Sequence, residues 1–502
     1  MLANLDYFKQ KIPGLWVSRD GGLLDDFRED HSGNRGEMPV ALVKPESVKH
    51  LRDLVLFCRE SGLRLQPISS KGAHYRGDTL GTSETIIVDM SGFDEVIRTD
   101  RRNRVLMFEA GVTFDRLVDA AQDSNLRPML PLCPKPAKSA LTSYLDREPT
   151  ISPRFQWDLS DPMLCVEMIT GTGQLFRTGA AAGPGGLTDQ WKAGDAQKFP
   201  MGPGALDAMR IFQGAQGGLG VVTWCTAKAE AIPEGENLYV LESESLAPLI
   251  ETAYGLLRRN HPDICFITNG AALAALTHRK VADWLKGKEA LSAWHLIFSL
   301  SQPKFAGKEK LAYVKREITA LCEQQGLIGS LDGFQVKHQL LHDIITNPSH
   351  PANDRWWKLA GMPVTREFFF QTTLDKAPSF LPAAKSICER YKRGWENVLC
   401  YIQPQLGGRC CHMEFIFPTD SSTLSASDEM MDLLTKTLKS NGAFFSRPYN
   451  AFGEAALAGE SGLSIIRKLK NIFDPAHIFS PNSLIFGHAK KEGDYDEKDS
   501  QQ

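Results

Sequence analysis

The sequence lacks the features that place a protein in a membrane or on nucleic acid. Its 502 residues carry 57 Lys and Arg against 60 Asp and Glu, so the formal charge of −3 offers no basic surface for phosphate backbones or anionic lipid. Mean hydropathy is −0.24, and no run approaches the roughly 18 apolar residues that span a bilayer. The N-terminus has neither the basic head nor the apolar core of a signal peptide. We therefore expect a cytoplasmic protein with no transmembrane segment and no nucleic-acid partner.

Common metal and nucleotide motifs are also missing. None of the ten cysteines forms a CxxC pair, which excludes a four-cysteine zinc site and a ferredoxin-type cluster. The glycine-bearing loops match neither the Rossmann GxGxxG nor the Walker GxxxxGK[ST] pattern. A nucleotide bound by this chain must therefore be held by another kind of fold.

The apolar periodicity of the first quarter predicts an α+β unit. At roughly 100–200 residues per domain, the length predicts two to four domains. Helical spacing, strand-forming runs and a possible helix cap at Thr113 follow in order. They predict a helix, a strand, a loop of small residues, two strands and a second helix, over residues 45–62, 65–68, 69–74, 85–90, 105–110 and 113–125.

Two later segments are expected to serve a ligand. Residues 130–153 are rich in proline and small polar residues, and long irregular loops in compact domains tend to be functional. The glycine-rich segment 179–204 is expected to be a mobile or ligand-covering loop. From about residue 234 the chain alternates helices and strands, which predicts a second α+β domain.

Two glycine-bearing loops are candidate anion sites. Residues 67–74 (PISSKGAH) combine small residues with one lysine, so that successive backbone N–H groups can converge on an anion. Residues 214–220 (GAQGGLG) form a second glycine cluster ahead of a predicted strand. Each loop taken alone is also compatible with a plain turn.

The order of these pieces carries a family resemblance. The runs PVALVKPESVKHLRDLVLFCRESGLRLQPISSKGAH, IIVDMSGFDEV, VLMFEAGVTFDRLVDAA and GAQGGLGVVT occur in sequence, and KLKNIFDPAHIFSPNSLIFG follows near the end. This arrangement resembles the vanillyl-alcohol oxidase/p-cresol methylhydroxylase (PCMH-type) superfamily, which includes a glycolate oxidase and D-lactate dehydrogenase-like branch. The resemblance covers nearly half of the chain, roughly residues 37–230 and 465–487.

The resemblance implies the fold class and the domain plan. The fold is expected to be α+β, with a PCMH-type FAD-binding domain of two α+β subdomains and an α+β substrate-binding cap. The expected boundaries give the FAD-binding domain, the cap, a C-terminal segment that returns to the FAD-binding domain and a disordered tail, over residues 1–233, 234–455, 456–487 and 488–502.

The same resemblance implies FAD as cofactor and names the residues around it. The loop that begins at Pro67 would wrap the diphosphate, the segment from Pro131 would follow the ring and ribityl chain, and the second glycine cluster would line the other side. The implied residues are Pro67, Ser69, Ser70, Lys71, Gly72, Ala73, His74, Pro131, Ser139, Thr142, Ser143, Gly217, Gly220, Val221, Val222 and Asn482.

His74 has two readings. In many relatives with a GGH loop, a histidine at this point is bonded covalently to the flavin. Here the sequence is Gly72-Ala73-His74, and the following residues depart from the family spacing by one position. The other reading is a histidine that hydrogen-bonds or packs against noncovalent FAD.

One strand of the expected cap resembles a metal-binding strand of the hydroxy-acid branch. Residues 401–414 read YIQPQLGGRCCHME, where that branch carries HxGDGNxH. His412 is retained, but the first histidine, the Asp-Gly-Asn and a downstream EHG are absent. Cys410, His412 and Glu414 would share one face of a strand and are the metal candidates. The alternative, which we adopt, is a strand without a metal.

Without a metal, oxidation of a substrate needs a base and a group that holds an anion. His412 is the candidate base because its ordinary pKa suits neutral pH, and Glu414 lies close enough in sequence to orient it. Arg409 or Arg447 is expected to hold a carboxylate or phenolate, and Tyr449 is a further polar candidate.

The predicted function is an FAD-dependent dehydrogenase or oxidase that takes a hydride from a 2-hydroxy acid or a 4-alkyl or 4-hydroxymethyl phenol. Since the chain has no cluster motif, its electrons are expected to pass to a partner such as an iron–sulfur subunit or an electron-transfer flavoprotein, in a homo- or hetero-oligomer. The alternative is an FAD-carrying electron-relay or structural subunit of a larger redox complex. An FAD- and NADPH-dependent enolpyruvyl reductase is a third, less fitting, possibility because such enzymes are usually much shorter.

Overall fold

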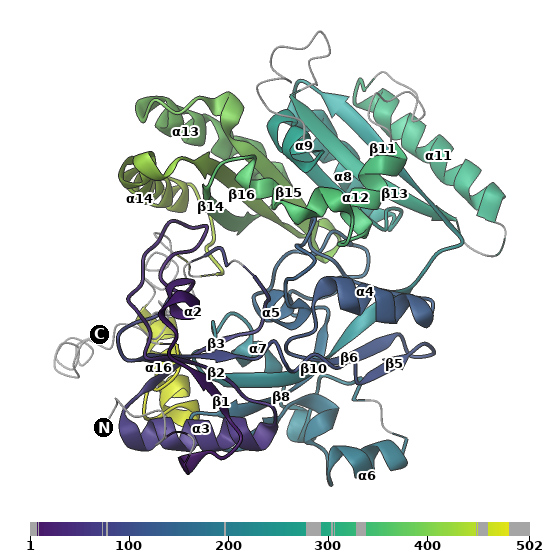
Figure 1. Ribbon diagram of the computed structural model, residues 1–502. Coiled ribbons are helices and arrows are strands. Elements are labelled where there is room, and N and C mark those ends of the chain that lie inside the picture. Colours follow the sequence, from purple (N-terminus) through teal and green to yellow (C-terminus); the bar gives the residue numbers. More distant parts are fainter. Residues whose placement is uncertain are drawn as a thin grey trace, which may run out of the picture.

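The computed structural model describes residues 8, 10–72, 74–76, 79–194, 197–277, 293–302, 305, 307–327, 338–447, 449 and 460–480. These residues form two stacked lobes, with two sheets in the lower lobe and one in the upper lobe (Figure 1). Helices and sheets are mixed in both lobes, so the α+β fold class predicted from the sequence is confirmed. In the described residues, no helix combines the length and the apolarity needed to cross a membrane.

The first sheet of the lower lobe contains three parallel strands and one antiparallel edge strand. Its order is β1-β2-β4-β3, with bounds Trp16–Ser18, Ala41–Lys44, Thr85–Asp89 and Arg64–Ile68. Helix α3 (Val48–Ser61) packs Leu51 and Val55 into the same core as this sheet. It begins later than expected because the Ser47 side chain caps it by accepting the His50 N–H.

The second sheet of the lower lobe is antiparallel and is organised around one long strand. Its order is β5-β6-β10-β8-β9, and β7 also pairs with β10; the bounds are Arg98–Asp100, Val105–Glu109, Gly220–Ala231, Met163–Thr170, Leu175–Arg177 and Leu126–Pro128. The short helix α2 (Gly21–Asp25) packs on the first sheet. Three helices lie beside the second sheet: α4 (Phe114–Asp123), α5 (Ala140–Leu145) and α7 (Met209–Phe212).

The described part of the glycine-rich segment 179–204 packs on itself and beside the second sheet, an arrangement that its composition did not indicate. It contains the short helix α6 (Leu187–Lys192), and part of it packs beside Trp224 of the second sheet. A polar side chain of the segment hydrogen-bonds to the segment's own backbone: Gln190 donates to the Ala181 and Gly183 carbonyls. The glycines therefore allow a compact, self-bonded fold of the segment.

The upper lobe is built on one antiparallel sheet of six strands. Its order is β11-β13-β12-β15-β16-β14, with bounds Gly235–Ser243, Trp294–Gln302, Cys265–Asn269, Leu399–Gln405, Cys410–Thr419 and Val364–Thr372. One face is covered by α8 (Leu246–Arg258), α11 (Gly307–Gln324), α13 (Ala377–Arg390) and α14 (Leu424–Ser440). Residues of α9 (Gly270–Leu276) and α12 (His338–Thr346) pack on the opposite face.

Residues 130–153, predicted to be one irregular loop, contain helix α5, which the Ser139 side chain caps, and they lie between the lobes. Its Leu132, Cys133 and Ile151 pack against the second face of the upper sheet. The Ile151 carbonyl also accepts the Cys265 N–H of β12 at 3.0 Å. This loop therefore holds the upper sheet over the lower lobe and fixes which side chains of the sheet face the gap between them.

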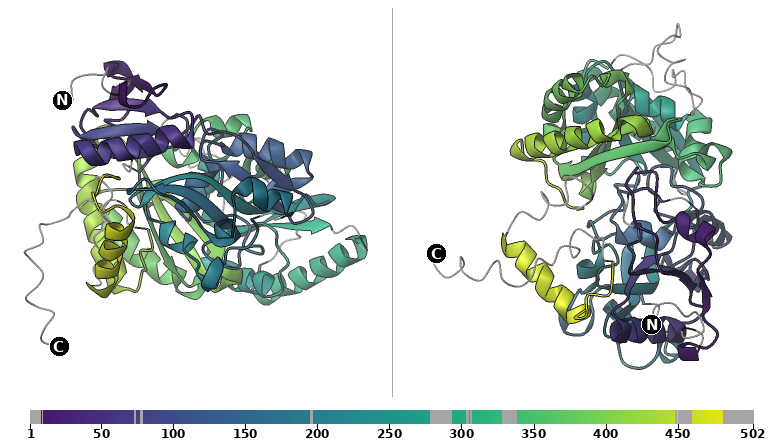
Figure 2. Two further views of the ribbon diagram at one scale, coloured as in Figure 1. Left: turned by 90° about the horizontal axis from the view of Figure 1, so that it is seen from below. Right: turned by 60° about the vertical axis from the view of Figure 1, so that its left-hand side comes forward.

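The C-terminal helix α16 (Glu460–Phe473) and the residues after it pack on the lower lobe (Figure 2). Leu65 of β3 exchanges backbone hydrogen bonds with Ile478 and Ser480, at 2.6 and 2.8 Å. Lys470 is buried, and its ammonium donates to Asp474 and to the carbonyls of Gly218 and Phe479. One lysine thus joins the helix, the returning segment and the second glycine cluster.

We expect Lys470→Met to destabilise the lower lobe, because it leaves the buried Asp474 carboxylate without its cation. Breaking a buried ion pair in this way typically costs about 3–5 kcal/mol of unfolding free energy. Urea unfolding followed by circular dichroism measures the change. Lys468→Met is the matched control, since Lys468 lies exposed on the same helix. Equal unfolding midpoints for the two variants would contradict a structural role for the Lys470 contacts.

Candidate active site: two adjoining cavities

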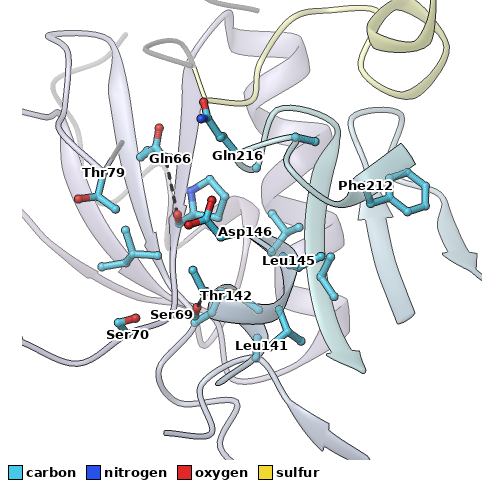
Figure 3. Close-up of a pocket in the computed structure, with 18 of the residues that line it drawn as sticks. Gln66, Ser69, Ser70, Thr79, Leu141, Thr142, Leu145, Asp146, Phe212 and Gln216 are labelled. Carbon is cyan, nitrogen blue, oxygen red and sulfur yellow. Dashed lines mark hydrogen bonds between the residues drawn. The ribbon is translucent and has the colours of Figure 1, made fainter. Parts of the chain in front are cut away.

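The larger cavity lies where the two sheets of the lower lobe meet. Its walls come from the end of β3, from α5, from Phe212 of α7 and from the glycine cluster that leads into β10 (Figure 3). The space between its lining atoms, including the open mouth, is about 1200 Å³. We call it the first cavity.

The sequence-predicted cofactor residues that line the first cavity come from three separate segments. Pro67, Ser69, Ser70 and His74 come from the loop after β3, and Thr142 comes from α5. The glycine cluster and β10 contribute Gly217, Gly220, Val221 and Val222. Ser69 and Thr142 are joined by a hydrogen bond between their hydroxyls and lie together in Figure 3.

Five other predicted residues are placed elsewhere or act indirectly. Lys71 is exposed and pairs with Asp94 at 3.4 Å, and Gly72 beside it does not line the cavity. Ser139 caps α5 by accepting the Thr142 N–H, and Ser143 donates to Glu148. Pro131 lines a different cavity, while Ala73 and Asn482 are outside the described residues.

The residues of the first cavity suit a flavin nucleotide. Met90, Leu141, Met168 and Phe212 offer apolar walls for a ring system, while the serines and backbone amides of the loop after β3 offer donors for phosphate. The buried Gln66 Oε1, on the cavity wall, has no hydrogen-bond partner in the described chain. Such an orphaned polar atom fits a site that receives a polar ligand.

Gly217 lies in the wall of the first cavity, where the backbone of the glycine cluster comes close to Pro67 and Ser480. Its φ is +73°, and a Cβ built there would lie 2.8 Å from Ser480 Oγ and 3.0 Å from Pro67 Cγ. A larger residue would push the glycine cluster away from the loop after β3. The width of the first cavity therefore depends on this glycine.

His74 lines the first cavity, and burial lowers its pKa from the ordinary histidine value. Its ring lies 6.3 Å from that of Phe27, centroid to centroid. The imidazole is thus neutral at neutral pH, which is compatible with either of the two readings drawn from the sequence.

A second, smaller cavity lies between the lobes and adjoins the first. Tyr75, Arg76 and Lys138 line both cavities. The rest of the wall combines apolar and aromatic residues of both lobes with charged groups: Pro131, Leu132, Cys133, Pro134, Lys135, Glu148, Pro149, Trp356, Trp357, Lys358, Tyr401, His412, Glu414 and Arg447. We call it the second cavity.

Arg76 stands at the centre of a buried network of charges between the cavities. It contacts Asp146 at 2.8 Å, Glu148 at 2.9 Å and Glu367 of β14 at 3.3 Å. Lys358 bridges Glu367 and Glu414 at 2.7 and 2.6 Å. Burial alone would lower the pKa of Lys358, but these two carboxylates raise it above the ordinary value, so the lysine stays charged.

His412 is held in this network in its neutral form. Its Nε2 lies 3.2 Å from Glu414 Oε2, and its Nδ1 lies 3.5 Å from a guanidinium nitrogen of Arg447. Burial, then Arg447 and Lys358, lower the pKa of His412 well below the ordinary value. The surrounding cations oppose its protonation, which the sequence could not show, and the role of His412 as a base stays a hypothesis.

The other predicted catalytic residues divide between the second cavity and the surface. Arg447 is buried, stacks 3.9 Å above the Phe369 ring and lies 3.6 Å from Asp146. Tyr449 lines the first cavity and donates a hydrogen bond to Asp146. Arg409 is exposed at the turn before β16, where it donates to the Leu406 carbonyl, so it does not reach the site.

The three metal candidates of this strand do not all line one cavity. Cys410 is only partly buried at the start of β16, and it does not line the second cavity. In the described residues, no group of three or more His, Cys, Asp or Glu side chains is arranged to hold a metal ion. The His412–Glu414 pair is occupied by Arg447 and Lys358 instead.

Sequence reasoning missed most of the charged network. Asp146 and Glu148 lie in the long loop that was expected to be functional, where two carboxylates at spacing two were the available signal. Tyr75 and Arg76 directly follow the predicted phosphate loop. Lys358 and Glu367 lie far along the chain from Arg76 and Asp146, so no sequence pattern pointed to them.

Comparisons with known proteins agree with this geometry. Residues 39–179 match the family model of an FAD binding domain. The flavoprotein subunit of 4-cresol dehydrogenase (hydroxylating) from Pseudomonas putida is 26% identical over 160 residues. That alignment spans 31% of this chain and 30% of the relative.

Solved structures share the fold over almost the whole chain. p-Cresol methylhydroxylase with substrate bound superposes with a TM-score of 0.78 at 17% identity, covering 95% of this chain and 96% of that one. 4-Ethylphenol oxidase from Gulosibacter chungangensis gives 0.78 at 16% with the same coverage. Alkyldihydroxyacetonephosphate synthase gives 0.63 at 14%, covering 89% and 77%. The family match shows that the chain carries an FAD binding domain, and the solved structures show that its fold is similar to that of p-cresol methylhydroxylase.

Proposed function

We propose that this protein is an FAD-dependent oxidoreductase that oxidises an alcohol-type or otherwise activated carbon of a small molecule. The observation that carries the proposal is the shared wall of the two cavities. Tyr75, Arg76 and Lys138 line both, so a molecule in the second cavity would lie beside the flavin site. When bound, FAD supplies the hydride acceptor, and the chain supplies binding, orientation and charge.

The walls of the second cavity favour an aromatic substrate over a small 2-hydroxy acid. Trp356, Trp357, Tyr75 and Tyr401 line it, together with several prolines. Aromatic side chains in a cavity wall bind an aromatic ring through apolar and edge-to-face contacts. We therefore propose 4-alkyl or 4-hydroxymethyl phenols as the first substrates to test.

Two buried donors are available to hold the substrate's reacting oxygen. The Tyr75 hydroxyl and Arg447 Nη1 have no hydrogen-bond partner in the described chain, although both belong to residues that line the second cavity. Unsatisfied buried donors are costly, and a substrate oxygen would satisfy them. We assign them to orienting the substrate.

His412 acts in this proposal by positioning Arg447. With its Nε2–H donated to Glu414, the Nδ1 lone pair faces Arg447. The Phe369 ring supports the guanidinium from its flat side. The histidine therefore fixes where the arginine points and remains uncharged itself.

The electron acceptor is proposed to be a separate protein, since the sequence has no iron–sulfur cluster motif of its own.

The alternative function is an FAD-carrying relay subunit without substrate chemistry. Alkyldihydroxyacetonephosphate synthase has the same fold, so the fold alone does not decide the reaction. Anaerobic mixing with substrates separates the two: a relay subunit would keep its oxidised flavin spectrum with every alcohol and phenol tested.

We predict that the purified protein is yellow and holds one FAD per chain. Because the loop around His74 departs from the family spacing, we expect the FAD to be released by acid. Flavin absorbance in the acid supernatant measures the stoichiometry, and in-gel fluorescence after denaturing electrophoresis detects any covalent flavin. Colourless protein that takes up no FAD would contradict the proposal, and fluorescence on the protein band would establish the covalent reading.

Arg447→Met should lower kcat/KM for 4-hydroxybenzyl alcohol by about tenfold to a hundredfold, the usual value of a hydrogen bond to a charged group. FAD content should stay the same, because Arg447 does not line the first cavity. Arg409→Met is the matched control and should retain wild-type kcat/KM, since Arg409 is exposed outside both cavities. The reverse pattern would restore Arg409 as the anion-binding residue.

The rate of anaerobic flavin reduction should show no ionisation of His412 between pH 6 and 8. The pKa of His412 is lowered, so the ring takes up a proton only at more acidic pH and is neutral throughout this window. His412→Gln should therefore keep the shape of the wild-type pH profile and lose less than about tenfold in rate, well below the loss of roughly 10²–10⁴ typical of a base. An ionisation near pH 6.5 that disappears in His412→Gln would show a base.

A further inference from the structure

A third cavity lies in the upper lobe, where the end of α13, the end of β16 and the start of α14 meet. The helices α13 and α14 lie side by side there (Figure 1). The space between the lining atoms, including the open mouth, is about 1070 Å³, close to that of the first cavity. It shares no lining residue with the first or the second cavity, so the proposed function leaves it without a role.

Two cations line the third cavity, and in the described chain neither Arg393 nor Lys392 is paired with a carboxylate. The half-buried Arg393 donates to the Pro418 carbonyl and to the Thr419 hydroxyl, both at 3.0 Å, and lies 5.8 Å from the centre of the Phe417 ring. These contacts orient the guanidinium without neutralising it, and they use only two of its five N–H donors. Burial lowers the pKa of Arg393 from the ordinary arginine value, and no carboxylate offsets this effect.

Lys392 occupies a backbone position where glycine is the usual residue. It follows Tyr391 at the end of α13 with a φ of +53°, and the next N–H, that of Arg393, donates to the Cys388 carbonyl. This arrangement is common at helix C-termini, where glycine adopts the left-handed conformation at no steric cost. The sequence instead has a lysine here, beside the cavity and next to the half-buried arginine.

The start of α14 adds a third positive element to the same wall. Thr423, Ala426 and Ser427 line the cavity and belong to the N-cap and the first turn of this helix. Thr423 does not cap the helix, because its hydroxyl donates to the Asp420 carbonyl at 3.0 Å instead. First-turn N–H groups without a side-chain cap are available to an anion, which the helix dipole also favours.

The rest of the wall combines apolar groups with a lack of negative charge. Met362, Pro418 and Met430 line the cavity, and among the described residues no carboxylate does. The acidic residues nearest along the chain bond other groups or face water: Asp420, which accepts from Ser422, Asp428, which pairs with Arg366, and the exposed Glu389, Glu396 and Glu429. A ligand that matches this wall is negative at one end and apolar at the other.

We propose that the third cavity binds a phosphate monoester with an apolar body. Lys392, Arg393 and the first turn of α14 hold the phosphate, and the two methionines with Pro418 contact the apolar body. A phosphate monoester carries about −1.5 to −2 charges at neutral pH, which matches two cations without a carboxylate. Guanidinium groups and helix N-termini both bind phosphate oxygens. The proposal does not depend on the reaction at the flavin site.

Calorimetric titration of the FAD-loaded protein with hexyl phosphate tests the proposal, and inorganic phosphate is the probe without an apolar body. We expect hexyl phosphate to bind more tightly than inorganic phosphate. Arg393→Met should weaken binding of hexyl phosphate by about tenfold to a hundredfold, the usual value of a hydrogen bond to a charged group. Arg390→Met is the matched control and should bind as wild type does, since Arg390 is exposed on α13 outside the cavity.

A second pair of variants keeps the test decisive if Arg393→Met fails to fold. Ala426→Asp places a carboxylate in the cavity wall at the first turn of α14, where an acidic residue suits the helix dipole. We expect it to leave the protein folded and to weaken binding of hexyl phosphate by about tenfold or more, because like charges repel. Ala426→Asn has nearly the same shape without the charge and should retain most of the affinity.

Vesicles that contain phosphatidic acid form a second arm, since this lipid carries the same phosphate monoester group. Binding of hexyl phosphate alone supports a free small molecule as the ligand, and vesicle binding that Ala426→Asp abolishes supports a lipid headgroup. The proposal is overturned if wild type binds neither probe, if hexyl phosphate binds no more tightly than inorganic phosphate, or if Ala426→Asp and Ala426→Asn bind equally. Loss of binding in Arg447→Met alone would place the phosphate in the second cavity and overturn it as well.

Discussion

The arrangement of the site depends on the ion pairs of Arg76. Its guanidinium bonds two carboxylates of the lower lobe, Asp146 and Glu148, and one of the upper sheet, Glu367. A guanidinium buried between lobes is tolerated only when its donors are paired, so this one residue links the closure of the lobes to the charge of the site. The same side chain forms part of the wall between the two cavities.

The chemistry of the site depends on a network of charged residues to which both lobes contribute. The upper sheet supplies Glu367, His412 and Glu414 on strands whose alternation turns them toward the lower lobe. The lower lobe supplies Arg76, Lys138 and the first cavity, while Lys358 comes from a turn packed on the upper sheet. The space between the lobes is therefore lined by paired charges from both lobes, beside the first cavity. Neither lobe forms this environment alone.

The sequence predicted the parts of the fold that depend on local order. The helix, loop and strands of the first quarter and the glycine cluster before β10 follow from residue spacing, and the cofactor class follows from the family resemblance that their order carries. The position of α3 was missed by three residues because a serine cap was not weighed against the proline before it. Segment 179–204 was misjudged because composition does not show which polar side chains bond the backbone of their own loop.

The site itself was only partly predictable, because its charges come from segments far apart in sequence. The residue type at His412 suggested a base, but its lowered pKa depends on Arg447 and Lys358, and only the folded chain brings these together. Arg409 and Arg447 were indistinguishable as arginines near the same strand, and exposure separates them.

We infer that the first cavity holds FAD while the second, across the Arg76 wall, holds the substrate. A crystal structure of the FAD-loaded protein soaked with 4-nitrophenol tests both halves at once. We predict flavin density in the first cavity between the loop after β3 and the glycine cluster, with the phenol in the second cavity between Tyr75 and Arg447. Flavin at another site, or the phenol bound only outside the second cavity, would contradict it.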